Sequence, residues 1–160
     1  MSQLTGLPEL RDTQVSTVSS AAVYQPGTLF VHRNGNNWGL VQYIQTDNNG
    51  CSRGEILVTN FATLVSYSVA KASTDDMYSR PLRGIACATI ASKYFGFMHV
   101  GGYVEKARVS NTVASGDFLS LSGSTAGELT GLGASPHVIG IARTAISATE
   151  GSISMVGIWG

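Results

Sequence analysis

Short segments rich in β-branched residues, each ended by Gly, Asn or Ser, recur along most of this 160-residue chain. The segments 28–33 and 38–45 flank Asn34-Gly35-Asn36-Asn37, whose residues tolerate positive φ and therefore predict a hairpin. No 11-residue window has the apolar spacing of an amphipathic helix. The pattern predicts an all-β fold: a single small β-barrel or β-sandwich of about ten short antiparallel strands.

The other strands are expected in the same way, from short apolar runs between turn residues. The segment 63–69 also fits a short helix, and the polar segment 71–80 is expected to be a loop with room for one helical turn. The remaining predicted strands are 55–59, 82–90, 94–100, 103–109, 117–121, 128–130, 138–145 and 152–158.

One short sequence pattern occurs twice in the chain. Gly84-Ile85-Ala86 leads through a polar turn to 98–103, and Gly140-Ile141-Ala142 leads through another turn to 155–159. A glycine at the start of a strand marks a bulge, a corner or the close approach of another backbone. We interpret the copies as two hairpins that cover each other across a small barrel. The alternative is a chance similarity between β-rich segments.

Residues 1–24 form a separate zone, which ends before Pro26-Gly27. Val15 and Val18 are interspersed with Ser and Thr between residues 13 and 20, which favours an extended strand. The zone has too little apolar surface to fold alone. It is either a frayed terminus or an extended arm laid on a neighbouring subunit. The expected organisation is therefore an extended N-terminal arm, 1–24, followed by one β-domain, 25–160.

The composition is unusually poor in charge. Charged residues make up 12% of the chain, and the formal net charge is zero, whereas about 25% charged residues is typical. Because the chain has no excess of positive charge, we expect it to bind neither nucleic acid nor an anionic membrane. The first residues lack the pattern of a signal peptide, and no segment approaches the ~18 apolar residues of a transmembrane helix. We expect a protein made in the cytoplasm, with much of its surface covered by neighbours.

Motifs for catalysis or metal binding are not found: there is no P-loop, Gly-x-Ser-x-Gly, His-Glu-x-x-His or paired-cysteine spacing. His32, His99 and His137 are far apart and are expected to be structural. Cys87 and His99 form one pair worth testing as nucleophile and base, but a thiol in an apolar strand is normally inert. Cys51 and Cys87 are expected to be free thiols. We predict no enzyme activity, no metal and no cofactor.

The aromatic residues have an alternative use, in a carbohydrate-binding module. Exposed rings would stack on sugars, and Asn34, Asn36 and Asn37 would bind hydroxyl groups. Against this, three of the candidate rings lie in one predicted hairpin, where at least one face must be core. The candidate rings are those of Trp38, Tyr43, Tyr94, Phe95, Phe97 and Trp159.

Several phrases of the chain resemble a known class of proteins. They are Ala-Ser-Gly-Asp-Phe-Leu at 114–119, Ser-Thr-Ala-Gly-Glu-Leu at 124–129, His-Val-Ile-Gly-Ile-Ala at 137–142 and Tyr-Gln-Pro-Gly-Thr at 24–28. Together they resemble the capsid decoration, or head cement, proteins of tailed bacteriophages of the marine-phage type. The resemblance spans roughly residues 24–160, in strand–turn–strand phrases without a chemical signature.

The resemblance implies a structural virion protein on the capsid exterior, often a homotrimer, without enzyme activity. Such a protein binds the outer surface of the assembled capsid and stabilises it by bridging subunits of the major capsid protein, where weak contacts add as avidity. The alternatives are a phage tail or fibre component and a separate carbohydrate-binding module. For partner contacts we expect the arm, the hairpin tip and the polar loop, namely Leu4, Leu7, Leu10, Gln14, Val15, Val18, Asn34, Asn36, Asn37, Asp75 and Asp76.

Overall fold

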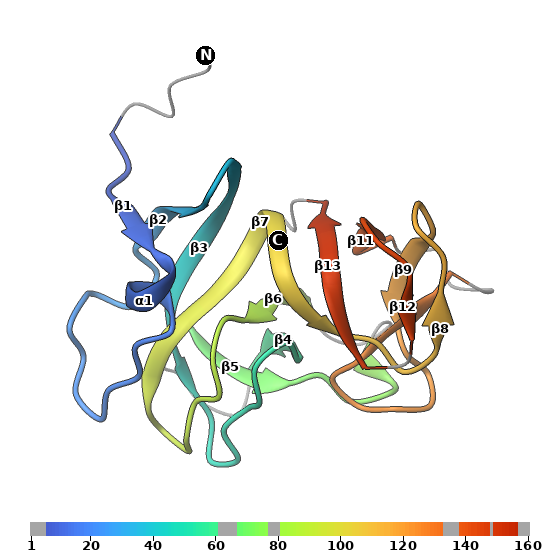
Figure 1. Cartoon of the computed structure of the whole chain (residues 1–160). Coiled ribbons are helices and arrows are strands. Elements are labelled where there is room, and N and C mark those ends of the chain that lie inside the picture. Colours follow the sequence, from blue (N-terminus) through green and yellow to red (C-terminus); the bar gives the residue numbers. More distant parts are fainter. Residues whose placement is uncertain (1–5, 61–66, 77–80, 133–137, 148, 157–160) are drawn as a thin grey trace.

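The structure is a computed structural model, and it describes residues 6–60, 67–76, 81–132, 138–147 and 149–156. The all-β prediction is confirmed (Figure 1). The short helix α1 (Asp12–Val15) is a single turn near the N-terminus. The strands are β1 (Glu9–Arg11), β2 (Leu29–Asn34), β3 (Asn37–Thr46), β4 (Ile56–Thr59), β5 (Ser68–Lys71), β6 (Leu82–Ala86), β7 (Phe95–Arg108), β8 (Thr112–Val113), β9 (Phe118–Leu121), β10 (Leu129–Gly131), β11 (Gly140–Ala142), β12 (Ile146–Ser147) and β13 (Glu150–Met155).

Five of these strands close into a small barrel, in the order β3-β5-β4-β6-β7. The ring closes because β7 pairs with β6 on one side and with β3 on the other. One buried cluster contains a side chain from each of these strands, together with Cys51 and Ile90 from the segments between them. The strand side chains are Ile44, Leu57, Val69, Ala86 and Met98, all close to fully buried.

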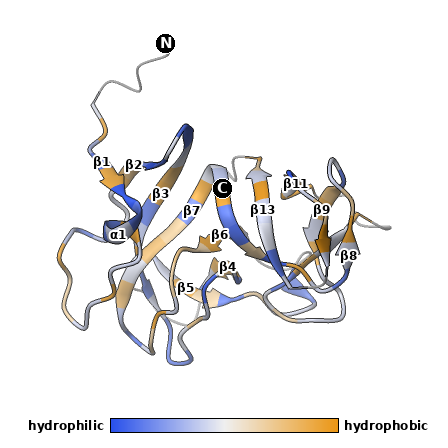
Figure 2. Cartoon of the chain, viewed as in Figure 1, coloured by the Kyte–Doolittle hydropathy of each residue, from blue (hydrophilic) through white to orange (hydrophobic). Residues whose placement is uncertain are grey.

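A second lobe continues from the same sheet. β7 extends beyond the barrel and pairs with β13, which is followed by β11, β9 and β10. A bridge between Val109 and Leu129 connects β10 back to the chain just after β7. The largest hydrophobic cluster spans both lobes, because it combines Ile56, Val58 and Ile85 of the barrel strands with side chains of the second lobe. Figure 2 shows hydrophobic residues on the strands and hydrophilic ones at the β2–β3 tip. The long strand β7 therefore joins the two lobes.

The predicted hairpins are confirmed at their main positions. β2 and β3 pair through Asn34 and Asn37, with φ of +58° at Gly35, as in a hairpin turn with glycine first. The two glycines of the repeated phrase approach a neighbouring backbone. A Cβ on Gly84 would lie 2.2 Å from the carbonyl oxygen of His99, and one on Gly140 would lie 2.9 Å from that of Ser154. The close approach expected of both glycines is thus confirmed.

The arrangement of the two hairpins differs from the prediction. β6–β7 belongs to the barrel and β11–β13 to the second lobe, and they meet edge to edge because β13 pairs with β7. The predicted strands 94–100 and 103–109 are one continuous strand, β7, which passes through Gly102 at a φ of +79°. Two pairings are parallel, β1–β2 and β3–β5, where antiparallel pairs were expected. Residues 63–66 and 77–80 of the predicted segments lie outside the described residues.

Candidate functional site: the docked arm and its surroundings

The described part of the N-terminal arm lies on the chain's own barrel. β1 runs parallel to β2, with Leu10 opposite His32 in the register. Leu10 and Val15 are buried with Phe30 in one hydrophobic cluster. The expectation of a frayed terminus is therefore wrong for residues 9–15, whereas contact of the arm with a neighbouring subunit stays a prediction. These apolar side chains find their partners within the same chain.

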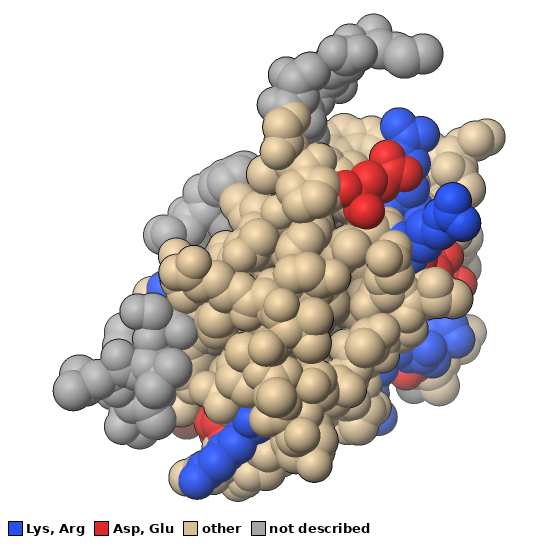
Figure 3. All heavy atoms as spheres, turned by 90° about the vertical axis from the view of Figure 1, so that its left-hand side faces the viewer, with Lys and Arg blue, Asp and Glu red and all other residues tan. Residues whose placement is uncertain are grey.

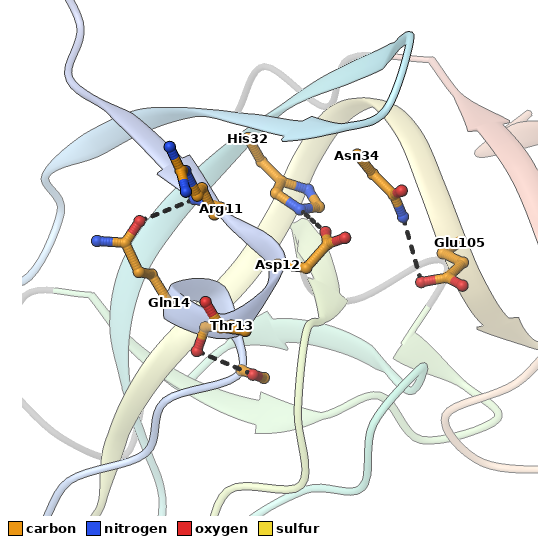
Figure 4. Close-up of polar contacts among 8 residues, drawn as sticks. Arg11, Asp12, Thr13, Gln14, His32, Asn34 and Glu105 are labelled. Carbon is orange, nitrogen blue, oxygen red and sulfur yellow. Dashed lines mark hydrogen bonds and ion pairs between the residues drawn. The ribbon is translucent and has the colours of Figure 1, made fainter.

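The extended strand predicted for residues 13–20 is wrong in its first part, where the chain forms α1. The backbone N–H of Arg11 donates to Oε1 of Gln14 at 2.9 Å (Figure 4). The hydroxyls of Ser16 and Thr17 donate to the carbonyl oxygen of Thr13 at 3.1 and 3.2 Å. Ser and Thr side chains that bond to nearby backbone compete with extended structure. The Ser/Thr pattern, which suggests a strand, forms a helical turn in this segment.

The predicted contact residues of the arm differ in accessibility. Leu7 is exposed, but Leu10 and Val15 are buried within the chain and are not free to anchor a partner. Gln14 is exposed and bonded to Arg11, and Val18 packs partly against the barrel core. Leu4 lies outside the described residues.

Two asparagines of the hairpin tip form hydrogen bonds with side chains elsewhere in the chain. Asn34 Nδ2 donates to Glu105 Oε2 at 3.3 Å, and Arg143 Nη1 donates to Asn37 Oδ1 at 2.8 Å. Asn36 at the turn is exposed. The tip is thereby tied to both β7 and the segment after β11.

The polar loop is not brought together with the arm. It follows β5 at the bottom of Figure 1, whereas the arm lies at the upper left. Asp75 is exposed, but Asp76 is buried and its Oδ2 accepts a hydrogen bond from the backbone N–H of Ser73 at 2.6 Å. Asp76 therefore stabilises its own loop.

A pocket of about 260 Å³ lies beneath α1 and contains two histidines. A carboxylate oxygen of Asp12 in α1 is in hydrogen-bond contact with Nε2 of His32, as Figure 4 shows. The rings of His32 and His99 lie 5.4 Å apart between centroids. His99 is only 6% exposed, and its Nδ1 has no hydrogen-bond partner. The lining residues are Asp12, Thr13, Val15, Ser16, His32, Arg53, Ala86, Cys87, His99, Glu105 and Lys106.

Burial shifts the pKa of two groups in this pocket, His99 and Cys87. It lowers the pKa of His99 to about 3, and the neighbouring charge of His32 acts in the same direction. Burial also raises the pKa of Cys87 well above its ordinary value, and that of Cys51 to about 12. Both cysteines are free, as expected. Cys87 therefore stays a protonated thiol, and the nearby His99 is too weak a base to remove its proton. An activated nucleophile requires a lowered thiol pKa or a stronger adjacent base.

Two further properties concern the described residues alone. Among them, no three His, Cys, Asp or Glu side chains are grouped as a metal ion would require. Nor does this part of the chain contain a helix long and apolar enough to cross a membrane.

The arm side of the molecule carries a broad uncharged surface. Residues 13–31 contain no Asp, Glu, Lys or Arg. Figure 3 looks onto this side, where the charged side chains gather near the margins. Val23 is 63% exposed and Tyr24 is 37% exposed. We call residues 13–31 and their surface the arm face.

A small groove of about 100 Å³ opens on the arm face. The rings of Tyr24, Tyr43 and Phe97 line it, with centroids 5.0–6.0 Å apart. The backbone N–H of Val23 donates to the hydroxyl of Tyr43 at 3.0 Å, which fixes Val23 at the groove. The groove offers an apolar floor within uncharged surroundings. Sequence reasoning missed Val23 and Tyr24, although the uncharged run 13–31 is a signal that can be read directly.

The aromatic candidates for sugar binding divide into two groups. Tyr43 and Phe97 are buried in the core, and Phe95 is half-buried against Tyr43. Trp38 and Tyr94 are exposed, while Trp159 lies outside the described residues. The candidate rings that the structure describes therefore do not form one platform.

No family model matches the chain, and no curated protein matches it.

Proposed function

We propose that the chain is a structural protein of a tailed-phage virion that binds the outer surface of the assembled capsid. It stabilises the capsid by bridging subunits of the major capsid protein. The observation that carries the proposal is the arm face, an uncharged surface with an exposed Val23 beside an aromatic groove. The resemblance of residues 24–160 to decoration proteins supports the same function.

An uncharged face suits a permanent contact with a protein lattice. Docking removes water from both surfaces, and an unpaired ion would make this costly. Val23 and Tyr24 supply apolar area, and the groove can accept a side chain from the capsid protein. A single contact of this size is weak. A homotrimer would present three arm faces, and their combined avidity would hold the protein on the shell.

The docked arm has a defined role in this proposal. Leu10 and Val15 hold it to the barrel, and residues 16–28 present the contact surface to the outside. The arm therefore acts as part of the binding face, in place of a strand donated to a neighbour. Because the surface is preformed, binding costs little ordering of the chain.

Co-sedimentation of the full chain with capsids assembled without it tests the proposal. We expect wild-type protein to bind. Val23→Asp, which buries a carboxylate at the contact, should weaken binding at least about tenfold. Val156→Asp is the matched control, since Val156 is 50% exposed in the second lobe. Thermal unfolding should show that both variants fold.

Two results would overturn the proposal. One is wild-type protein that does not bind the capsids and is found on the tail or absent from the virion. The other is a Val23→Asp variant that decorates capsids as well as the Val156→Asp control does.

A further inference from the structure

We propose that Asn34, at the tip of the β2–β3 hairpin, is a modification site that deamidates spontaneously to aspartate or isoaspartate in the folded protein. The chain contains another pair of the same kind, Asn49-Gly50, which the fold protects. The reaction needs only water, so it is independent of the proposed function.

The reaction joins the side chain of an asparagine to the backbone of the next residue. The backbone nitrogen of Gly35 attacks Cγ of Asn34 and forms a five-membered succinimide ring. The bond from Cγ to Nδ2 breaks, and the side-chain –NH2 group leaves as ammonia with the proton from the Gly35 nitrogen. Water then adds across one of the two ring C–N bonds, which gives aspartate or isoaspartate. A glycine in the second position favours the attack, because its backbone turns freely and no Cβ stands in the way.

Gly35 has room for this rearrangement. It is exposed, and a Cβ built on it would meet no atom within 4 Å. The ladder between β2 and β3 ends at the pair Asn34 and Asn37, so only the last pair must open. The Asn34 side chain is held by a hydrogen bond from Nδ2 to Oε2 of Glu105, which at 3.3 Å is long (Figure 4). The tip can therefore reach the geometry of attack by a small local opening.

Gly50 lacks this freedom. It is buried, and a Cβ on it would lie 2.5 Å from the carbonyl oxygen of Ile90. The next residue, Cys51, donates to Ile90 and accepts from it, both at 2.9 Å. The backbone N–H groups of Gly35 and Gly50 both lack a hydrogen bond within the described part of the chain. The difference between the two sites therefore lies in the backbone that surrounds the glycine.

Deamidation changes the contact between the tip and β7. A carboxylate at position 34 has no N–H to donate to Glu105, and it places a second negative charge beside that side chain. The hydrogen bond from Arg143 to Asn37 is left as a tie between the tip and the rest of the chain. The modified tip should therefore open more often than the original one.

Peptide mapping by mass spectrometry tests the inference on the full chain, incubated folded at mildly alkaline pH. We expect Asn34 to convert at least about tenfold faster than Asn49, which reacts only after a larger local unfolding. The control is the same chain in urea, where the two Asn-Gly pairs should convert at similar rates. The inference is overturned if Asn34 and Asn49 convert equally fast in the folded protein. It is also overturned if Asn34 stays intact for a time in which the chain in urea converts.

Asn34→Asp reproduces the aspartate product and tests its effect. Backbone amides of the β2–β3 ladder next to the tip should exchange hydrogen at least about twofold faster than in wild type. Asn36→Asp is the matched control, since it adds the same charge at an exposed position of the same tip. Equal exchange in the two variants would show that modification at Asn34 does not loosen the tip.

Discussion

Acidification should destabilise this protein through one buried histidine. His99 is enclosed beneath α1, and burial lowers its pKa to about 3, against an ordinary value of 6.5. The unfolded chain therefore binds a proton at His99 in a pH range where the folded chain does not. The stability contributed by neutral His99 is complete above pH 6.5 and is lost as the pH falls towards 3. Ionisable groups that line the same pocket are Asp12, His32, Arg53, Cys87, Glu105 and Lys106.

The magnitude follows from the difference between the two pKa values. Each pH unit below the unfolded value costs about 1.4 kcal/mol until the folded value is reached. At about pH 5 the loss from His99 alone is thus about 2 kcal/mol. For a chain of this size this corresponds to a fall in Tm of about 4–8 °C.

Urea unfolding of wild type and His99→Phe at about pH 7.5 and about pH 5 measures the effect. Other groups titrate over the same range, so the relevant quantity is the difference between the two proteins in their loss of unfolding free energy. We expect wild type to lose about 2 kcal/mol more than His99→Phe. His99→Gln provides a second variant in case the larger ring does not fit. Equal losses in wild type and both variants would refute the reasoning, because His99 would then titrate normally in the folded protein.

Three further predictions concern packing and reactivity. Leu10→Ala should lower the unfolding free energy by about 2–4 kcal/mol in urea, while the exposed Leu7→Ala should stay within about 0.5 kcal/mol of wild type; equal effects would mean that the arm is not docked. Gly84→Ala should cost about 1–3 kcal/mol because its Cβ meets the neighbouring backbone, whereas Gly123→Ala, with open space around it, should be nearly neutral by thermal unfolding. Cys87 should react slowly with a thiol reagent at about pH 8 and rapidly in urea; fast reaction in the native state would contradict its raised pKa.

Local features of this fold could be predicted from the sequence. The hairpin around Gly35 depends on a few neighbouring residues, and its strands lie where the β-branched runs place them. Another backbone lies against Gly84 and Gly140, and a glycine within a strand segment signals such an approach. Gly140 begins β11 as expected, whereas Gly84 lies inside β6 at a shift of register.

Features that depend on distant contacts could not be predicted. The barrel closes because β7 pairs with both β6 and β3, and the parallel pair β3–β5 depends on the same closure. The arm forms α1 because Ser16 and Thr17 bond back to Thr13, a choice that the Ser/Thr pattern leaves undecided. The local sequence does not show whether Ser and Thr hydroxyls bond to the nearby backbone in a helical turn or leave the chain extended as a strand.

The binding surfaces were predictable to different degrees. The contact of Arg143 with Asn37 at the hairpin tip could not be predicted, because 106 positions of the sequence separate the two residues. In the same way, Asp12 and His32 are twenty residues apart and are joined by the parallel pairing of β1 with β2.

A cryo-electron microscopy reconstruction of the virion tests the central claim most directly. The account predicts many copies of the protein on the outer surface of the head, each with Val23 and Tyr24 of the arm face against the major capsid protein. A head without the protein, or a bound protein whose arm face points into solvent, would contradict it.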